Sequence, residues 1–180
     1  VARMWMVRLL IQIAEAALFA FLLLWFRTLD ASVTDNRVAQ LFTVVLFTCV
    51  PLALIVGRWS DSTRRPRLPL TITAAGAAIG LAMLTFAQDI AAGIAGYVVF
   101  AIMAGVFLSL HASQTLRVLP RPATRGRDLG IFNLTNTVPS LIMPWLVLAL
   151  IPMFGFQALF ALLACFAALA CILLATMRKF

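Results

Sequence analysis

The chain has 180 residues, of which 64% are hydrophobic and 11% are charged, and its formal net charge is +8. A soluble domain of this length would expose far too much apolar surface, so the composition excludes a soluble globular protein. The positive charge does not indicate a nucleic-acid partner, because nearly all of it lies in short connectors, where it sets membrane topology and meets anionic lipid headgroups. The expected surroundings are a lipid bilayer.

Six apolar stretches follow one another along the chain. Each is long enough to cross about 30 Å of hydrocarbon, which takes about 20 helical residues. We predict a single domain, residues 1–180, with six transmembrane helices at approximately 6–27, 38–57, 68–88, 90–116, 129–151 and 156–177. The connectors are short, so helices that follow one another should be antiparallel neighbours. The predicted fold class is therefore all-α, a polytopic membrane bundle.

The connectors are alternately basic and free of excess positive charge. The basic ones are the N-terminus, residues 58–67, residues 117–128, and the C-terminus with Arg178 and Lys179. The others, at 27–37, 88–89 and 152–155, carry balanced, acidic or no charge. Because Lys and Arg gather in cytoplasmic loops, both termini and every second connector are predicted to be cytoplasmic. The expected location is a bacterial-type inner (cytoplasmic) membrane, crossed several times.

Caps and breakers are also visible in the sequence. Asp35 and Asn36 are expected to cap the second helix, and Asp89 the fourth, because their side-chain oxygens accept hydrogen bonds from first-turn amides. Pro139 and Pro144 should free backbone carbonyls and let the fifth helix bend.

Small residues recur in the third and fourth predicted helices. Gly76 and Gly80 form a GxxxG pair, and Ala92 and Gly96 form its small-xxx-small version. Small side chains let helix backbones approach closely in lipid, where packing drives association. We therefore predict tight packing along these two helices.

Polar side chains inside membrane spans are costly, and those of the first, fourth and fifth predicted helices share one depth. At about 1.5 Å per residue, Glu15 lies about 10 Å beyond Arg8, and His111 about 9 Å from the same cytoplasmic end. The first, fourth and fifth helices are thus predicted to line a polar vestibule in the cytoplasmic half of the membrane. The candidate residues for solute or protons are Gln12, Glu15, His111, Gln114, Asn133 and Asn136.

Four of these candidates also have a structural interpretation. Glu15 and His111 can exchange protons. Glu15 can equally remain a carboxyl that is protonated or paired for structure alone, and His111 can simply bond a backbone carbonyl. Asn133 and Asn136 can bond between helices instead of binding solute.

No sequence motif indicates an enzyme or a cofactor. The chain has a single histidine and lacks HExxH, a glycine-rich phosphate loop and a CxxCH haem sequence. Cys49, Cys165 and Cys171 lie in apolar stretches without CxxC spacing, so they are interpreted as small buried hydrophobic residues. We expect no catalytic residues, no metal and no cofactor.

The second basic connector runs from Gly57 through Asp61 to Arg67 and contains two further polar or basic motif residues. In this pattern it resembles the loop signature between helices 2 and 3 of the major facilitator superfamily, and its counterpart between helices 8 and 9. Arg64 replaces the usual second glycine and Ser62 the usual basic residue, as is more typical of the second-half copy. The segments 125–133 and 8–30 look like the entry to helix 11 and like helix 7 of such transporters. The residues at matching motif positions are Gly57, Ser60, Asp61, Arg65 and Arg67.

The resemblance implies a six-helix half built from 3+3 inverted repeats, most like the C-terminal half, with solute bound where two halves meet. Asp61 is expected to accept hydrogen bonds from Arg58 or Arg65, or to lie near the N-terminus of a neighbouring helix. In the family the corresponding aspartate helps to latch the two halves. A basic loop that only sets topology is the alternative.

Two functions follow from this. The first is one half of a membrane transporter for a small solute, with proton coupling left open, paired with a second six-helix half in the same chain, a homodimer or another subunit. The alternative is a transporter-derived structural or assembly subunit of a larger membrane complex, photosynthetic or respiratory, without transport activity. Residue 1 is Val, which also leaves an interior piece of a longer chain open.

Overall fold

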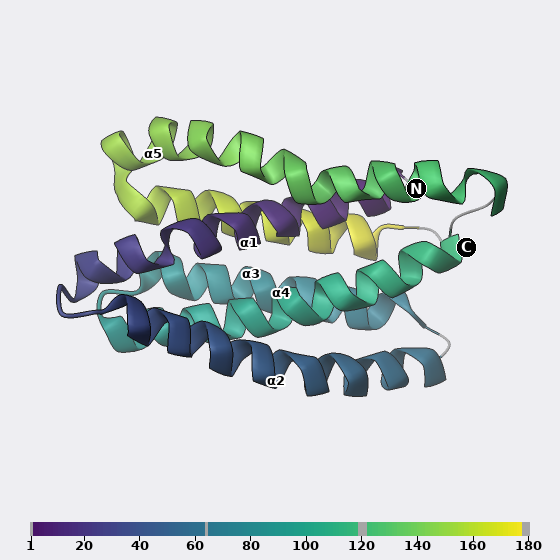
Figure 1. The fold of residues 1–180 in the computed structure, drawn as a ribbon, viewed down its shortest axis with the longest axis horizontal. Coiled ribbons are helices and arrows are strands. Elements are labelled where there is room, and N and C mark those ends of the chain that lie inside the picture. The colour runs from purple at the N-terminus through teal and green to yellow at the C-terminus, as the bar shows by residue number, and fades with distance from the viewer. Residues whose placement is uncertain (1, 64, 119–121, 178–180) are drawn as a thin grey trace.

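The computed structural model describes residues 2–63, 65–118 and 122–177, and these residues are helical except in short connectors. This confirms the prediction of an all-α fold, and the five long helices of the described part are each apolar enough to cross a membrane (Figure 1). The elements are α1 (Ala2–Leu29), α2 (Asp35–Ser62), α3 (Arg67–Phe86), α4 (Ile90–Val118), the short 3-10 helix η1 (Pro122–Thr124) and α5 (Arg125–Ala175).

The helices predicted at 129–151 and 156–177 both fall within the last element, which joins two helices across a kink. α5 is one element of 51 residues, and Gly155 alone inside it leaves helical geometry, with φ 76° and ψ −177°. This backbone region is essentially reserved for glycine. Figure 1 shows the α5 ribbon doubling back into two antiparallel arms. Pro139 and Pro144, the expected sites of bending, keep helical backbone angles.

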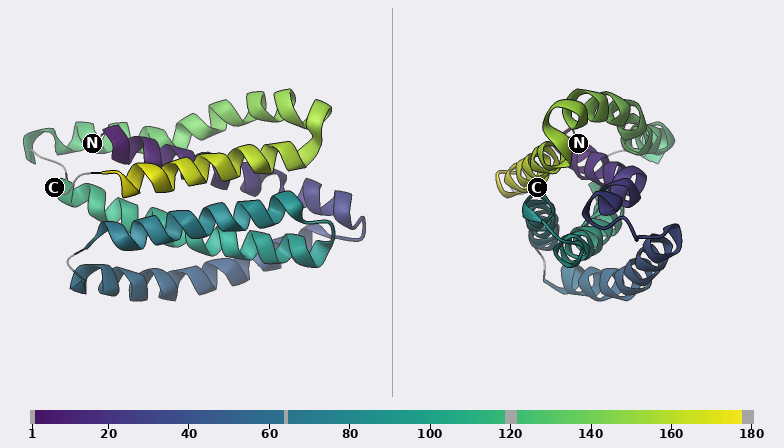
Figure 2. Two further views of the ribbon diagram at one scale, coloured as in Figure 1. Left: turned by 180° about the vertical axis from the view of Figure 1, so that it is seen from behind. Right: turned by 90° about the vertical axis from the view of Figure 1, so that its left-hand side faces the viewer.

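Two helix pairs make up the centre of the bundle. α1 packs on α5 and α3 packs on α4, while contacts of α3 with α5 and of α1 with α4 join the pairs (Figure 2). α2 lies at the edge, mainly against α4. Its buried residues are Val38, Val45 and Ser60, whereas Phe47 is 76% exposed. Most of its apolar surface therefore faces away from the bundle.

Small residues let α3 and α4 approach closely, as predicted. A Cβ atom added to Gly80 would lie 2.4 Å from the backbone nitrogen of Phe100, and one added to Gly76 would lie 2.6 Å from Cγ of Met103. Real atoms cannot approach this closely, so glycine is required where these two backbones meet.

The basic connectors gather at one end of the bundle. The start of α1, the link from α2 to α3, the start of the first arm of α5 and the end of its second arm all lie there (Figures 1 and 2). Contacts hold this end together: Arg67 donates a hydrogen bond to the carbonyl of Met177, and Nε1 of Trp5 donates to the carbonyl of Ile131 at 2.9 Å. Arg64, Arg178 and Lys179 of the predicted basic segments lie outside the described residues.

At the opposite end of the bundle, the predicted cap of α2 is wrong and the predicted cap of α4 is confirmed. Thr34, rather than Asp35 or Asn36, caps α2, its side chain accepting a hydrogen bond from the backbone nitrogen of Arg37 at 3.3 Å. Asp35 instead pairs with Arg27 at 2.6 Å. The prediction for Asp89 is confirmed, because its carboxylate accepts from the backbone nitrogen of Ala92 at 2.7 Å.

The cysteines differ from the expectation of buried hydrophobic residues. Cys165 is exposed, and Cys49 and Cys171 are half-buried. Cys165 lies on a part of α5 that faces outward, where a small apolar side chain suits lipid as well as a protein core.

Candidate functional site

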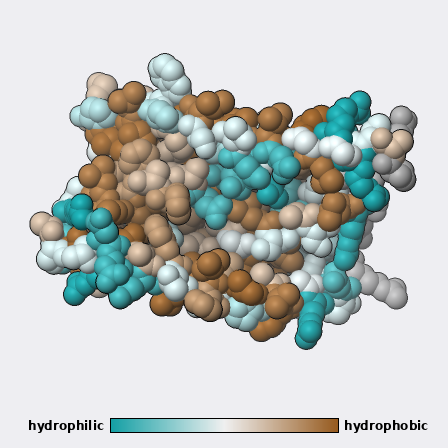
Figure 3. Space-filling view, viewed as in Figure 1, coloured by the Kyte–Doolittle hydropathy of each residue, from teal (hydrophilic) through white to brown (hydrophobic). Residues whose placement is uncertain are grey.

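A polar line runs along α1 through Arg8, Gln12 and Glu15. Their spacing of four and three residues places them on one face of the helix, and all three are half-buried. Figure 3 shows hydrophilic residues in the middle of the face on which α1 lies between α5 and α4, with hydrophobic surface around them. Oε1 of Gln12 is buried without a hydrogen-bond partner among the described residues. The amide oxygen of Gln12 can therefore still accept a hydrogen bond inside an otherwise apolar bundle.

Arg8 joins this line to α5. Its Nε donates to Oγ1 of Thr135 at 3.0 Å, and its terminal nitrogen donates to Oδ1 of Asn136 at 3.4 Å. Thr135 is fully buried, and its hydroxyl donates a hydrogen bond to the carbonyl of Phe132 at 2.6 Å. Asn133 lies one turn before Asn136 on the same helix, and both asparagines are exposed. In the sequence, Arg8 served as a marker of topology and depth, and Thr135 was not among the six candidate residues.

His111 is fully buried where α4 meets α1 and α5. Its Nε2 lies 2.8 Å from the carbonyl of Met4, which can only accept, so Nε2 carries the proton. Nδ1 lies 3.2 Å from Oγ1 of Thr115. The ring also contacts Phe107 and Phe132, with centroid distances of 5.7 and 6.2 Å. The imidazole therefore joins helices, in the manner of a structural histidine.

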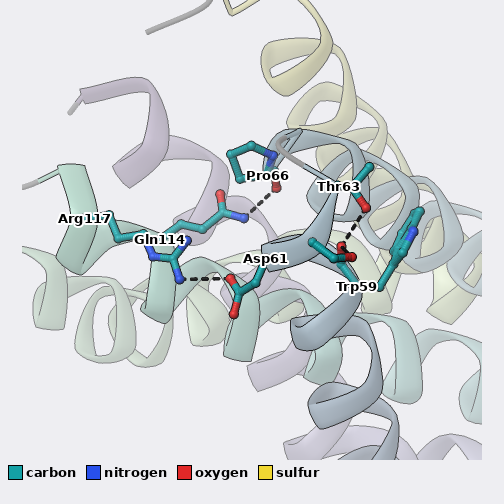
Figure 4. A network of polar contacts seen from close by, with 7 residues as sticks. Trp59, Asp61, Thr63, Pro66, Gln114 and Arg117 are labelled. Carbon is teal, nitrogen blue, oxygen red and sulfur yellow. Dashed lines mark hydrogen bonds and ion pairs between the residues drawn. The ribbon is translucent and has the colours of Figure 1, made fainter.

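Gln114 is hydrogen-bonded to the link between α2 and α3. It is 8% exposed, and its Nε2 donates to the carbonyl of Pro66 at 2.5 Å (Figure 4). Nearby, Arg117 of α4 donates to Asp61 of α2 at 2.9 Å. From the sequence we expected Asp61 to bond Arg58 or Arg65, or to lie near the N-terminus of a neighbouring helix. The pair forms with Arg117 because α2 packs against α4, and it remains a surface pair with both side chains more than half exposed.

At the end of the bundle where the basic connectors lie, residues of the loop motif line a cavity and also connect α3 to the end of α5. Gly57 and Asp61 line a cavity of about 350 Å³ between α2 and α4, together with Ser109, Ser113 and Gln114. Arg67 opens α3 and reaches the end of α5 through its bond to Met177. Arg65 is exposed in the link.

Glu15 faces a different region from His111. It lines a cavity of about 240 Å³ between α1, α2 and α4, whose other walls include Phe19, Phe42, Tyr97 and Cys49. Its carboxylate makes no hydrogen bond or ion pair with any residue that the structure describes. We did not predict these aromatic residues from the sequence, although Phe19 lies one helical turn from Glu15 on the same face.

Long apolar helices, charge gathered at the bundle ends and a polar line within define a multi-pass membrane protein. A family model described as Major Facilitator Superfamily matches residues 4–179. The chain therefore belongs to the major facilitator superfamily, whose members are transporters. Comparison with curated proteins gave no match.

Proposed function

We propose that this chain forms one half of a secondary transporter for a small solute, with Glu15 as the proton-coupling carboxylate. The observation that carries the proposal is the polar line of α1. Within the part of the chain that the structure describes, Glu15 has neither a hydrogen bond nor an ion pair, and the buried amide oxygen of Gln12 has no donor; such groups are expensive in a membrane, and function is the usual reason for keeping them. Asn133 and Asn136 extend the polar surface onto α5.

A second six-helix half would complete the solute path. Support comes from large apolar side chains that the bundle leaves exposed on α2 and on the first arm of α5, such as Phe47 and Trp145, both 76% exposed. The partner half belongs to the same polypeptide, to a second copy or to another subunit. Alternating access then follows from rocking of the two halves about the site.

The proposed topology has six crossings in 3+3 inverted repeats, with cytoplasmic termini in a bacterial-type inner membrane. The reversal of α5 at Gly155 supports the sixth crossing. The basic connectors at one end of the bundle support the orientation, because Lys and Arg gather on the cytoplasmic side.

A structural or assembly subunit without transport activity is the second candidate function. His111 and Gln114 favour it, because both are buried and each bonds a backbone carbonyl of a neighbouring segment. Two of the six candidate residues thus hold neighbouring segments together through these bonds. The exposed apolar faces would then contact other subunits of a larger membrane complex.

Native mass spectrometry and uptake assays separate the two functions. A transporter half should be recovered as a longer chain or as a tight pair, and Glu15→Gln should abolish proton-driven uptake in proteoliposomes. Asp35→Asn is the matched control, since this exposed carboxylate lies at the opposite end from the basic connectors. Recovery of a single copy within a multi-subunit assembly that tolerates Glu15→Gln would support the structural subunit instead.

A further inference from the structure

Three aromatic rings gather around the cavity that Glu15 lines. Phe42 of α2 stacks on Phe19 of α1 at a centroid distance of 5.7 Å, and it contacts Tyr97 of α4 at the same distance with an interplanar angle of 60°. All three rings line the cavity with Glu15. Phe42 is half-buried and Tyr97 is 7% exposed, whereas Phe19 is 75% exposed and lies at the open side.

Glu15 is the charged residue of this cavity lining, and its other lining residues are mainly apolar. The nearest cation along α1 is Arg8, seven residues before Glu15, and the two charges interact electrostatically without forming an ion pair. The guanidinium of Arg8 is already bonded to Thr135 and Asn136 of α5. The carboxylate of Glu15 therefore shares its cavity with three aromatic rings, while the hydrogen bonds of Arg8 go to α5.

A carboxylate beside aromatic faces selects one class of ligand. The faces of aromatic rings carry negative electrostatic potential, and a ring of them binds ammonium groups, quaternary ones above all. A carboxylate adds charge complementarity, and apolar walls accept the alkyl groups that such a cation carries. An anion would be repelled, and a neutral polar solute would find few hydrogen-bond partners in these walls.

We propose that the cavity between α1, α2 and α4 binds a small organic ammonium cation, with Glu15 as its counter-ion and Phe42 as the central ring. This rests on the proposed transport function, for which it names the substrate class. The volume of about 240 Å³ suits a compact head group better than an extended drug-sized molecule. Glu15 and the three rings contact the cation directly.

Choline is the probe, and 3,3-dimethylbutan-1-ol, its uncharged isostere, is the matched ligand. Equilibrium dialysis against the purified protein in lipid nanodiscs should show saturable choline binding and at least about tenfold weaker binding of the isostere. Glu15→Gln should weaken choline binding by about tenfold or more and bring the two ligands close together. Folding of each variant is checked by circular dichroism and size-exclusion chromatography.

Phe42→Leu tests the ring separately from the charge, because it keeps an apolar side chain but removes the π face. It should weaken choline by about fivefold and leave the isostere nearly unchanged. Phe47→Leu is the control on the same helix, since Phe47 is exposed and does not line the cavity.

Equal binding of the two ligands, no choline binding by a folded protein, or indifference of choline to Glu15→Gln and Phe42→Leu would each overturn the inference. Dialysis requires no transport, so these outcomes are distinct from the uptake assay. Glu15-dependent uptake of another solute without choline binding would leave the proposed function standing and remove this substrate class.

Discussion

Arg8 and Thr135 lie 127 residues apart in the sequence, and Nε of Arg8 donates to Oγ1 of Thr135 at 3.0 Å. The threonine hydroxyl accepts this hydrogen bond and donates another to the carbonyl of Phe132, so the two bonds are compatible. A half-buried guanidinium thereby connects α1 to the first arm of α5. The polar line on α1 is therefore part of the packing as well as a candidate solute surface.

Replacing Arg8 should loosen the contact between α1 and α5. Hydrogen bonds to charged groups contribute about 1.5–3 kcal/mol each when buried, so half-buried Arg8→Ala should cost about 1–2 kcal/mol. Unfolding by SDS, followed by circular dichroism, measures the free energy of unfolding. Arg3→Ala is the control, because Arg3 is exposed on the same helix. Equal stability of the two variants would contradict a bridging role for Arg8.

The fold class and the segregation of charge could be read from the sequence because both depend on local composition. An apolar run of about 20 residues demands a helix in lipid, wherever it packs. The position of a residue along a helix follows from counting at 1.5 Å per residue. Glu15 and His111 were therefore assigned a common depth.

The direction in which a side chain faces depends on packing, and this is where the sequence interpretation failed to resolve the site. Glu15 faces α2 and α4, while His111 faces Met4 of α1 inside the bundle. Glu15 and His111 therefore do not line one cavity, although the sequence placed them at the same depth. The partners of Arg8 and Asp61 were missed for the same reason, since Thr135 and Arg117 are distant in the chain.

Substitution of Gly80 should disrupt the packing of α3 on α4. A Cβ at this position would lie 2.4 Å from the backbone nitrogen of Phe100, and a backbone atom cannot move aside cheaply. Gly80→Ala should therefore destabilise the protein by about 1–3 kcal/mol, the usual cost of overpacking. The free energy of SDS unfolding is again the measurement.

Gly57→Ala is the matched control for Gly80→Ala. Gly57 is also helical, but no atom lies within 4 Å of its added Cβ. Alanine should stabilise the helix there by up to about 1 kcal/mol, because glycine is the poorer helix former. A destabilisation of the same size at both sites would contradict the close approach at Gly80.

Asp30 should titrate below its ordinary pKa. The hydroxyl of Ser32 donates to its carboxylate at 2.7 Å and the backbone nitrogen of Ser32 at 2.9 Å, and these bonds lower the pKa of Asp30 from its usual 3.8. A depressed pKa in the folded state means that the turn is stabilised above the ordinary pKa. This contribution is lost as the pH falls through the folded-state value.

Carbon-13 NMR of the Asp30 carboxyl measures this shift. Ser32→Ala removes the largest cause and should raise the pKa of Asp30 toward 3.8. Thr28→Ala is the control, since the hydroxyl of Thr28 bonds the carbonyl of Trp25 and not Asp30. An unchanged pKa in Ser32→Ala would assign the depression to another group.

Gly155 should be the residue on which the reversal of α5 depends. Its φ of 76° with ψ of −177° lies where a side chain strains the backbone by about 1–3 kcal/mol. Apart from the adjoining backbone, no atom of the described residues lies within 4 Å of an added Cβ, so Gly155→Ala tests backbone conformation without a steric clash. We expect it to lower the free energy of SDS unfolding by this amount. Gly130→Ala, in the helical first arm with equally open surroundings, should instead be neutral or slightly stabilising. Tolerance of Gly155→Ala equal to that of Gly130→Ala would show that alanine leaves the reversal unstrained, and the fold-back would then depend on packing of the two arms against α1 and α3.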